Sequence, residues 1–281
     1  MRDSMKKSRK LVALTLTVVL GLSALTGCGK KGSGSNEKEI VVGATIQPHA
    51  EILNSDAFQN KLKDLGYTVK VVEYTDYVQP NEATQDGSLD ANFFQHQPFL
   101  DDFNKENKGS LVSVAKVHYE PYGLYAGKTS SLENIKDGAT IAVPNDSSNE
   151  ARALQMLQAG GLITLKEDAG LMATVNDIVE NTHNISFKEI ESAQTPLVLN
   201  DVDFAVINGN YAMQAGLNVQ KDALLLEDAK SVGAETYANI LVVKEENQDS
   251  DKTKALVEAI TSDEVKSFME EKYSGAVIPV Y

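Results

Sequence analysis

Short apolar runs that alternate with helix-length amphipathic runs constrain the fold of this chain most strongly. Runs rich in β-branched residues predict strands, and segments with apolar residues every three to four positions predict helices. Strand–helix alternation of this kind predicts an α/β fold with a largely parallel sheet. The expected strands are residues 40–46, 68–74, 90–94, 111–117, 122–126, 140–143, 187–190, 203–207 and 240–243, and the expected helices are residues 49–65, 98–107, 148–159, 252–260 and 263–272.

The pattern starts a second time at residue 140. A strand there runs into Pro144, and a helix follows that stops at Gly160-Gly161. Ser147 and Glu150 lie three residues apart, and this spacing predicts a capping box at the helix start. Because the strand–helix pattern begins twice, we expect two lobes. The roughly 250 residues after the N-terminal segment are enough for both.

The N-terminal segment has the three parts of an export signal. Basic residues 6–10 precede an apolar run at residues 11–25, and Thr26-Gly27 lie directly before Cys28, the single cysteine of the chain. The apolar run is shorter than the roughly 20 residues that cross a bilayer as a permanent helix. The arrangement resembles the lipobox of bacterial lipoproteins. It implies a signal peptide at residues 1–27 and a lipid on Cys28 that holds the protein on the extracytoplasmic face of the cell membrane; an uncleaved anchor helix is the alternative.

Composition narrows the range of partners. Residues 28–38 lack large apolar side chains and predict a flexible tether. The chain has 26 basic and 40 acidic side chains, and cleavage after residue 27 would leave 21 and 39, a net charge of −18. So acidic a surface repels phosphate backbones, and we expect no nucleic-acid partner.

A single cysteine excludes an intramolecular disulfide, so the hydrophobic core must hold the fold.

Arg152 is the first candidate for ligand binding. It lies in the second turn of the helix that follows the polar loop 145–149, and free amides at a helix start attract anions. A guanidinium at that position could bind a carboxylate, with charge-assisted hydrogen bonds of about 1.5–3 kcal/mol each. The alternative is an exposed arginine paired with Glu150 or Asp146.

Two carboxamides follow or precede apolar strands. Asn208 stands at the carboxyl end of the strand at 203–207, where ligands bind in open α/β sheets. Asn239 directly precedes the apolar run 240–243. A carboxamide both donates and accepts hydrogen bonds, so these residues suit an amino group and a carboxylate. A helix cap and a turn are their alternative roles.

Aromatic residues and histidines gather in two runs, residues 93–96 and 118–122, with two tyrosines just upstream of the first. Such a set could line a slot for an apolar or thioether side chain, where sulfur–aromatic contact adds about 0.3–1.5 kcal/mol. It could equally form ordinary core. The candidates are Tyr74, Tyr77, Phe94, His96 and His118.

Support for catalysis or for a metal site is weak. His96 and His118 with a carboxylate could hold a metal, but neither histidine stands in a His-x-x-His or Glu-x-x-His spacing. A hydrolase with either histidine as base would also need a nucleophile, and no strand-to-helix serine elbow is present. We therefore expect no enzyme activity and no cofactor, with a surface-anchored hydrolase and a metal-binding lipoprotein as alternatives.

The chain resembles the methionine-binding lipoproteins, the substrate-binding components of methionine ABC importers. The resemblance covers residues 40–281. It is carried by residues 90–96 (DANFFQH), 143–146 (VPND), 149–154 (NEARAL), 205–212 (AVINGNYA) and 237–243 (YANILVV). Around Ala193-Gln194-Thr195-Pro196-Leu197 the chain departs from the family, which more often has leucine before the proline and arginine after it.

The resemblance implies a two-lobed periplasmic-binding-protein fold of the second type, with a ligand cleft between the lobes. Lobe I would take residues 39–122 plus 236–281, and lobe II residues 123–235. Arg152 would hold the α-carboxylate of an amino acid, and Asn208 and Asn239 its amino and carboxylate groups. Asn149 would add a polar contact, and the aromatic and histidine candidates would line the side-chain slot.

The function implied by the resemblance is capture of methionine, in the first place L-methionine, by a monomer. The loaded protein would deliver the ligand to an ABC importer permease and its ATPase. D-methionine, or a dipeptide that contains methionine, remains an alternative ligand.

Overall fold

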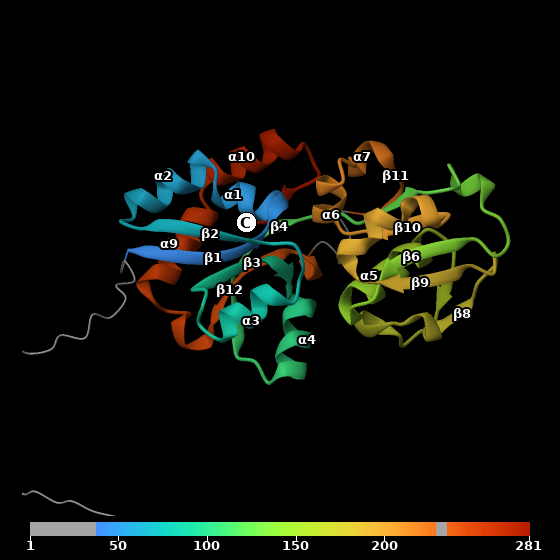
Figure 1. Ribbon diagram of the computed structural model, residues 1–281, viewed down its shortest axis with the longest axis horizontal. Helices are drawn as coiled ribbons and strands as arrows, with labels where there is room; N and C mark the ends of the chain where they lie inside the picture. The colour runs from blue at the N-terminus through green and yellow to red at the C-terminus, as the bar shows by residue number, and fades with distance from the viewer. Residues whose placement is uncertain (1–37, 229–234) are drawn as a thin grey trace, which may run out of the picture. The chain divides into compact units, whose positions relative to one another are not determined.

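The computed structural model describes residues 38–228 and 235–281. The predicted signal peptide, Cys28 and all but the last residue of the predicted tether lie outside the described residues. Within them the structure is built around two mixed β-sheets (Figure 1), and no helix has the length and apolar character that crossing a membrane requires.

The first sheet has six strands in the order β13-β4-β12-β3-β1-β2. The three strands β1, β2 and β3 run parallel, and the three others are antiparallel to their neighbours. Their bounds in chain order are β1 (Glu39–Thr45), β2 (Thr68–Tyr74), β3 (Ala91–His96), β4 (Leu111–Tyr119), β12 (Asn239–Lys244) and β13 (Ile278–Pro279).

The second sheet has five strands in the order β11-β5-β10-β6-β9. Here β6 pairs in parallel with β9 and β10, whereas β5 is antiparallel to both of its neighbours. The strands are β5 (Gly123–Ala126), β6 (Thr140–Pro144), β9 (Ser186–Ile190), β10 (Phe204–Ile207) and β11 (Ala223–Leu226), and a separate two-stranded sheet pairs β7 (Thr164–Leu165) with β8 (Ile178–Glu180).

The two sheets share one topology. The order β2-β1-β3-β12-β4 in the first corresponds to β9-β6-β10-β5-β11 in the second, with the same parallel and antiparallel pairs. The fourth strand in this order has a different origin in each sheet: β12 returns from the C-terminal part of the chain, whereas β5 precedes the other strands of its sheet. The expectation of a largely parallel sheet is only half right, because these two strands run antiparallel to both of their neighbours.

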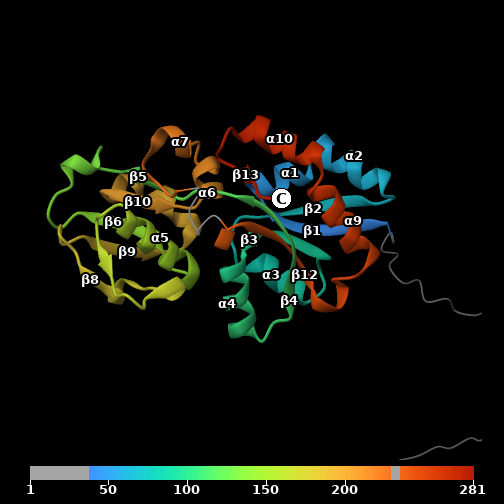
Figure 2. The same ribbon diagram turned by 180° about the vertical axis from the view of Figure 1, so that it is seen from behind.

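Helices cover both faces of the first sheet (Figure 1). In Figure 1, α2 and α10 lie above the strands and α3 and α4 lie below them, and Figure 2 shows the same arrangement from behind. The helices are α1 (Glu51–Leu53), α2 (Asp56–Asp64), α3 (Gln79–Gln85), α4 (Gln97–Asn107), α5 (Ser147–Ala159), α6 (Gly209–Gln214), α7 (Val219–Asp222), α9 (Asp251–Ile260) and α10 (Asp263–Tyr273). Shorter helical turns are η1 (Ile46–Ala50), η2 (Leu132–Asn134), η3 (Gly170–Met172), η4 (Val175–Asp177), η5 (Ser192–Asp201) and η6 (Glu245–Asn247).

Most expected elements are confirmed, but the helix expected at residues 49–65 is not continuous. It breaks after α1, and Ser55 starts α2 by accepting a hydrogen bond from the amide of Phe58. A serine inside an apolar pattern favours a new N-cap over an uninterrupted helix, because its hydroxyl replaces a missing backbone partner. The helix α3 was not expected, since its sequence lacks an apolar stripe.

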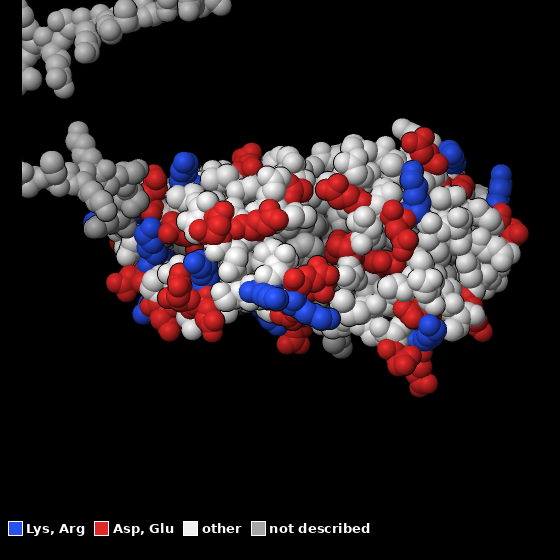
Figure 3. Space-filling model, turned by 60° about the horizontal axis from the view of Figure 1, so that its bottom comes forward, with Lys and Arg blue, Asp and Glu red and all other residues white. Residues whose placement is uncertain are grey.

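The surface of the described residues is acidic, in line with the composition. On the face drawn in Figure 3, acidic side chains are more widespread than basic ones. An acidic face of this kind repels phosphate backbones, and the absence of a nucleic-acid partner stays a prediction.

Stability should depend on the buried strands of each sheet. Phe204 on β10 is 0% exposed, and we expect Phe204→Ala to lower the free energy of unfolding by about 3–5 kcal/mol. Leu197 is 70% exposed, and Leu197→Ala should change the free energy of unfolding by less than about 0.5 kcal/mol. Urea unfolding followed by circular dichroism measures both; equal losses would contradict the assigned core.

Candidate functional site: an enclosed polar cavity

A cavity lies where elements of the two sheets meet. Its wall comes from β3 and the start of α4 in the first sheet's layer, from α5 and α6 beside the second sheet, and from the connection between β4 and β5. Seven of the nine ligand-binding candidates line it: Tyr77, Phe94, His96, Asn149, Arg152, Asn208 and Asn239.

Tyr74 and His118 do not line the cavity. Tyr74 ends β2, and its ring lies over Gly43, where an added Cβ would be 3.1 Å from Cε2 of the tyrosine. His118 is fully buried behind the wall, with Nε2 2.7 Å from Oε1 of Glu120, which does line the cavity. His118 can therefore act on a ligand only through Glu120.

Asn149 organises one polar side of the cavity. Asp146 caps α5 by accepting a hydrogen bond from the amide of Asn149, and it also accepts one from the Asn149 side chain. The Asn149 Oδ1 atom accepts the Tyr122 hydroxyl at 2.6 Å and the Asn208 amide at 3.0 Å, and it lies 3.1 Å from Nε2 of His96. Burial, together with the nearby Arg152 charge, lowers the pKa of His96 to about 3, so this histidine is neutral.

Arg152 is 3% exposed and lies between two aromatic rings. The guanidinium carbon is 4.0 Å from the ring centre of Tyr122 and 4.6 Å from that of Tyr237. Nη2 donates to Oε2 of Glu227 at 2.6 Å and to the backbone carbonyl of Glu120 at 2.8 Å. Arg152 is thus a fixed cation in the cavity wall, held by a buried carboxylate.

The alternative of an exposed arginine paired with Glu150 or Asp146 is wrong. Glu150 instead accepts the amide of Val175, and Asp146 is the N-cap of α5. The capping box predicted from Ser147 and Glu150 is wrong for the same reason, since the helix starts one residue earlier than that box requires.

The sequence did not point to Glu227, Glu120 or His49 as site residues, nor to the cavity residues Phe99, Tyr122 and Asn210. Glu227 follows the apolar strand β11, and this position at a strand end was the available signal. Glu120 lies between Tyr119 and the cavity residue Tyr122 in a run already singled out for its aromatics. No local pattern marks His49, because its partners Asn239 and Glu120 are distant in the sequence.

Two buried atoms of the cavity residues have no hydrogen-bond partner among the described residues. They are Oδ1 of Asn208, which accepts, and Nδ2 of Asn210, which donates. Asn210 uses its own Oδ1 to accept the Tyr77 hydroxyl. Buried polar atoms are rarely left unpaired, so these two atoms indicate that the cavity receives a ligand with both donor and acceptor groups.

One side of the cavity is aromatic. The ring centres of Tyr77, Phe94 and Phe99 lie 5.8 to 5.9 Å from one another, at tilted or edge-to-face angles. Rings in this arrangement offer faces and edges to an apolar or sulfur-containing side chain. The cavity is therefore polar at one end and aromatic at the other.

Hydrogen bonds outside and inside the cavity join the layers of the two sheets. Ser147 at the start of α5 donates to Asp102 on α4 at 2.8 Å, and Tyr211 on α6 donates to the carbonyl of Thr75 at 3.1 Å. Together with the contact between Tyr77 and Asn210, they hold the cavity in an enclosed arrangement.

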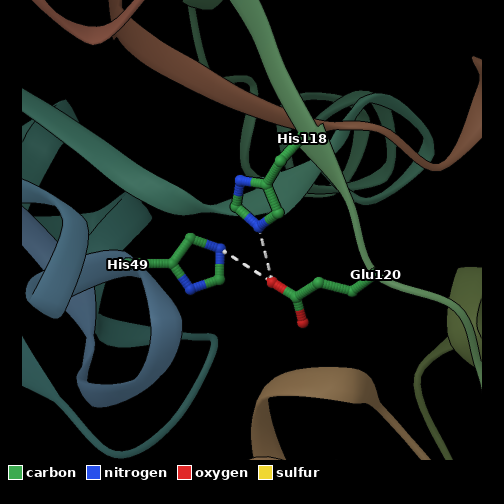
Figure 4. Close-up of side chains that lie close together, drawn as sticks. All are labelled: His49, His118 and Glu120. Carbon is green, nitrogen blue, oxygen red and sulfur yellow. Dashed lines mark hydrogen bonds and ion pairs between the residues drawn. The ribbon is translucent and has the colours of Figure 1, made fainter. Parts of the chain in front are cut away.

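His49, His118 and Glu120 are the one group in the described part of the chain that could hold a metal (Figure 4). Their ligand atoms lie within 4.8 Å of one another. His118 Nε2 and Glu120 Oε1 are 2.7 Å apart, whereas two ligands of a tetrahedral zinc lie about 3.3 Å apart. The spacing therefore fits a hydrogen-bonded network better than a metal site. The sequence offered His96 and His118 as possible metal ligands, and His96 does not belong to this group.

The buried pair of Arg152 and Glu227 generates a test of stability. Burial opposes ionisation of Glu227, but the charge and hydrogen bonds of Arg152 outweigh it and hold the pKa of Glu227 below its ordinary 4.5. We expect Glu227→Gln to lower the free energy of unfolding at pH 7 by about 3–5 kcal/mol, because it leaves a buried guanidinium without its anion.

The pH dependence follows from the direction of that shift. A lowered pKa stabilises the fold above pH 4.5, and the contribution is lost as the pH falls through the pKa in the folded state. The difference in the free energy of unfolding between Glu227→Gln and the wild type should therefore become smaller as the pH falls below 4.5. Glu246→Gln, which breaks the exposed pair with Lys244, is the control and should cost at most about 1 kcal/mol. Similar losses for both variants would contradict the account of the pair.

Comparison with known proteins places the chain in a family. The model of the NlpA lipoprotein family matches residues 40–281. The methionine-binding lipoprotein MetQ of Bacillus subtilis (strain 168) is 42% identical over 94% of this chain and 96% of its own. The D-methionine-binding lipoprotein MetQ of Escherichia coli (strain K12) is 39% identical over 92% of this chain and 94% of its own.

A solved structure supports the same conclusion. The nutrient binding protein from Burkholderia cenocepacia, bound to methionine, superposes with a TM-score of 0.81 at 43% identity, over 86% of this chain and 100% of that chain. The matches confirm the resemblance and the two-lobed binding-protein fold expected from the sequence. The chain belongs to the NlpA lipoprotein family.

Proposed function

We propose that this protein is a lipid-anchored, extracytoplasmic solute-binding protein that captures L-methionine and delivers it to an ABC importer. The observation that carries the proposal is the composition of the cavity wall. A fixed guanidinium, an unpaired amide donor and an unpaired amide acceptor lie in the same wall as a cluster of aromatic rings. A zwitterion with a soft apolar side chain satisfies all of these groups at once. The names of the relatives, which include methionine-binding lipoproteins, support the same ligand.

The hydrogen bonds of the two asparagines suggest a role for each. Asn208 donates its amide to Asn149, so its free Oδ1 suits the ligand's ammonium group. Asn239 Oδ1 lies 2.9 Å from Nε2 of His49, which leaves the Asn239 amide to donate to the ligand's carboxylate. Arg152 would hold the same carboxylate, and Asn149 would position both Asn208 and His96.

The aromatic end would select the side chain. Burial of a methionine side chain contributes about 1.5–3 kcal/mol, comparable with one charge-assisted hydrogen bond. Polar groups would therefore select an amino acid, and the shape of the slot formed by Tyr77, Phe94, Phe99 and His96 would select methionine among amino acids.

The rest of the chain supports transport. We propose that lobe I takes residues 39–122 and 236–281 around the first sheet and that lobe II takes residues 123–235 around the second. The lipid on Cys28 would hold the monomer at the membrane. The closed, loaded form would dock on the permease, which works with its ATPase.

The amide assignments are tested by calorimetry. Asn208→Ala and Asn239→Ala should each weaken L-methionine binding by roughly 10- to 100-fold, because each removes a hydrogen bond to a charged group worth about 1.5–3 kcal/mol. These variants test ligand binding more specifically than Arg152→Ala, because Arg152→Ala would also remove the cation that pairs with Glu227. Asn134→Ala, at an exposed position on η2, is the control and should not change affinity. Unchanged affinity in both site variants would refute the proposed polar contacts.

D-methionine is a second candidate ligand, since one of the similar relatives is named as a D-methionine-binding lipoprotein. A thermal-shift series with L-methionine, D-methionine and the dipeptide Gly-Met separates the candidates. The proposal predicts the largest shift with L-methionine. Equal shifts by unrelated amino acids would contradict methionine selectivity.

A further inference from the structure

Glu120 presents a buried carboxylate to the cavity. It follows β4 in the connection to the second sheet and lines the wall with Arg152 and Asn208. Its Oε1 lies 2.7 Å from Nε2 of His118 and 3.5 Å from Nε2 of His49 (Figure 4). Its Oε2 faces the start of α6, where an added Cβ at Gly209 would lie 2.9 Å away. The hydrogen bond with His118 therefore fixes Oε1, and the backbone amide of Asn210 stabilises the ionised carboxylate.

The hydrogen bonds of His49 show that this histidine is neutral. Nε2 is 2.9 Å from the amide oxygen of Asn239, which only accepts, so Nε2 carries the hydrogen. Nδ1 is 2.7 Å from the Thr45 hydroxyl and can accept its hydrogen. Burial lowers the pKa of His49 to about 4, in agreement with this tautomer.

His118 is also neutral. Its Nε2 donates to Glu120, and its Nδ1 is buried without a partner among residues 38–228 and 235–281. A protonated ring would bury an unpaired N–H, which costs about 1–3 kcal/mol. Burial lowers the pKa of His118 to about 3. His118 therefore orients Glu120 by a hydrogen bond, and neither histidine cancels its charge.

The cations of the site do not cancel that charge either. Arg152 donates to Glu227 through its side chain and to Glu120 only at the backbone carbonyl. Among the described residues, no lysine or arginine forms an ion pair with the Glu120 carboxylate. Burial raises the pKa of Glu120, although the charge of Arg152 and the backbone amide of Asn210 oppose this effect, and a cation that entered the cavity would stabilise the ionised carboxylate.

We infer that Glu120 is the anion that recognises the ligand's ammonium group, with His118 as its positioning residue. The inference rests on the proposed capture of an amino acid and restricts the cargo to molecules with a free cationic amino group. The three N–H bonds of an ammonium group would reach Glu120 and the unpaired Oδ1 of Asn208, which line the same cavity. An N-acylated or desamino analogue would leave both acceptors without a donor.

Calorimetry of the wild type with three ligands tests this assignment without any variant. The ligands are L-methionine, methioninol, which keeps the ammonium and lacks the carboxylate, and 4-(methylthio)butanoic acid, which keeps the carboxylate and lacks the ammonium. The wild type should bind 4-(methylthio)butanoic acid at least 100-fold more weakly than L-methionine and at least 10-fold more weakly than methioninol. The reverse order of the two analogues would overturn the role of Glu120.

The variant Glu120→Gln adds a readout that a purely structural role would not change. It should reduce the preference for L-methionine over 4-(methylthio)butanoic acid to less than 10-fold, whereas Glu120→Asp, which keeps the charge, should retain most of it. If Glu120→Gln preferred L-methionine over 4-(methylthio)butanoic acid as strongly as the wild type does, the role assigned to Glu120 would be overturned, while the proposed capture of methionine would still stand. Failure of the wild type to bind L-methionine would overturn the proposed function and this assignment with it.

Discussion

The buried pair of Arg152 and Glu227 holds together the parts of the chain that form the site. Arg152 comes from α5 of the second layer, whereas Glu227 follows β11, where the chain leaves the second sheet. Glu227 also accepts the hydroxyl of Tyr119 and the amide of Tyr122, which flank the outgoing connection from β4. One ion pair thus ties both connections between the sheets to α5. Desolvation of two charges is costly, and here the ring faces and the extra hydrogen bonds offset it.

The arrangement also separates the charges of the site. The cation of Arg152 is paired with Glu227, whereas the Glu120 carboxylate is contacted by neutral His118 and the backbone amide of Asn210, with the charge of Arg152 nearby. A site built this way is prepared for a ligand that brings its own positive charge and a carboxylate for the remaining amide donors. The aromatic end contributes about as much free energy as one charge-assisted hydrogen bond, and it also restricts the shape of the ligand.

Local patterns in the sequence predicted the elements and the position of several cavity residues. The strand at residues 68–74 is confirmed residue for residue, and Asn208 was expected because ligands meet the carboxyl ends of strands. The partner of Arg152 was not predictable, because Glu227 is 75 residues away and only the returning connection brings the two together. His49 and Asn239 are 190 residues apart for the same reason. Periodicity identifies elements, but pairings of this range depend on the order of strands in the sheets.

A crystal structure of the protein grown with L-methionine would show how the ligand lies in the cavity. We expect a methionine with its ammonium within hydrogen-bond distance of Glu120 and Asn208, its carboxylate toward Arg152 and Asn239, and its thioether among Tyr77, Phe94 and Phe99. A methionine with its carboxylate against Glu120, or bound outside this cavity, would contradict this expectation.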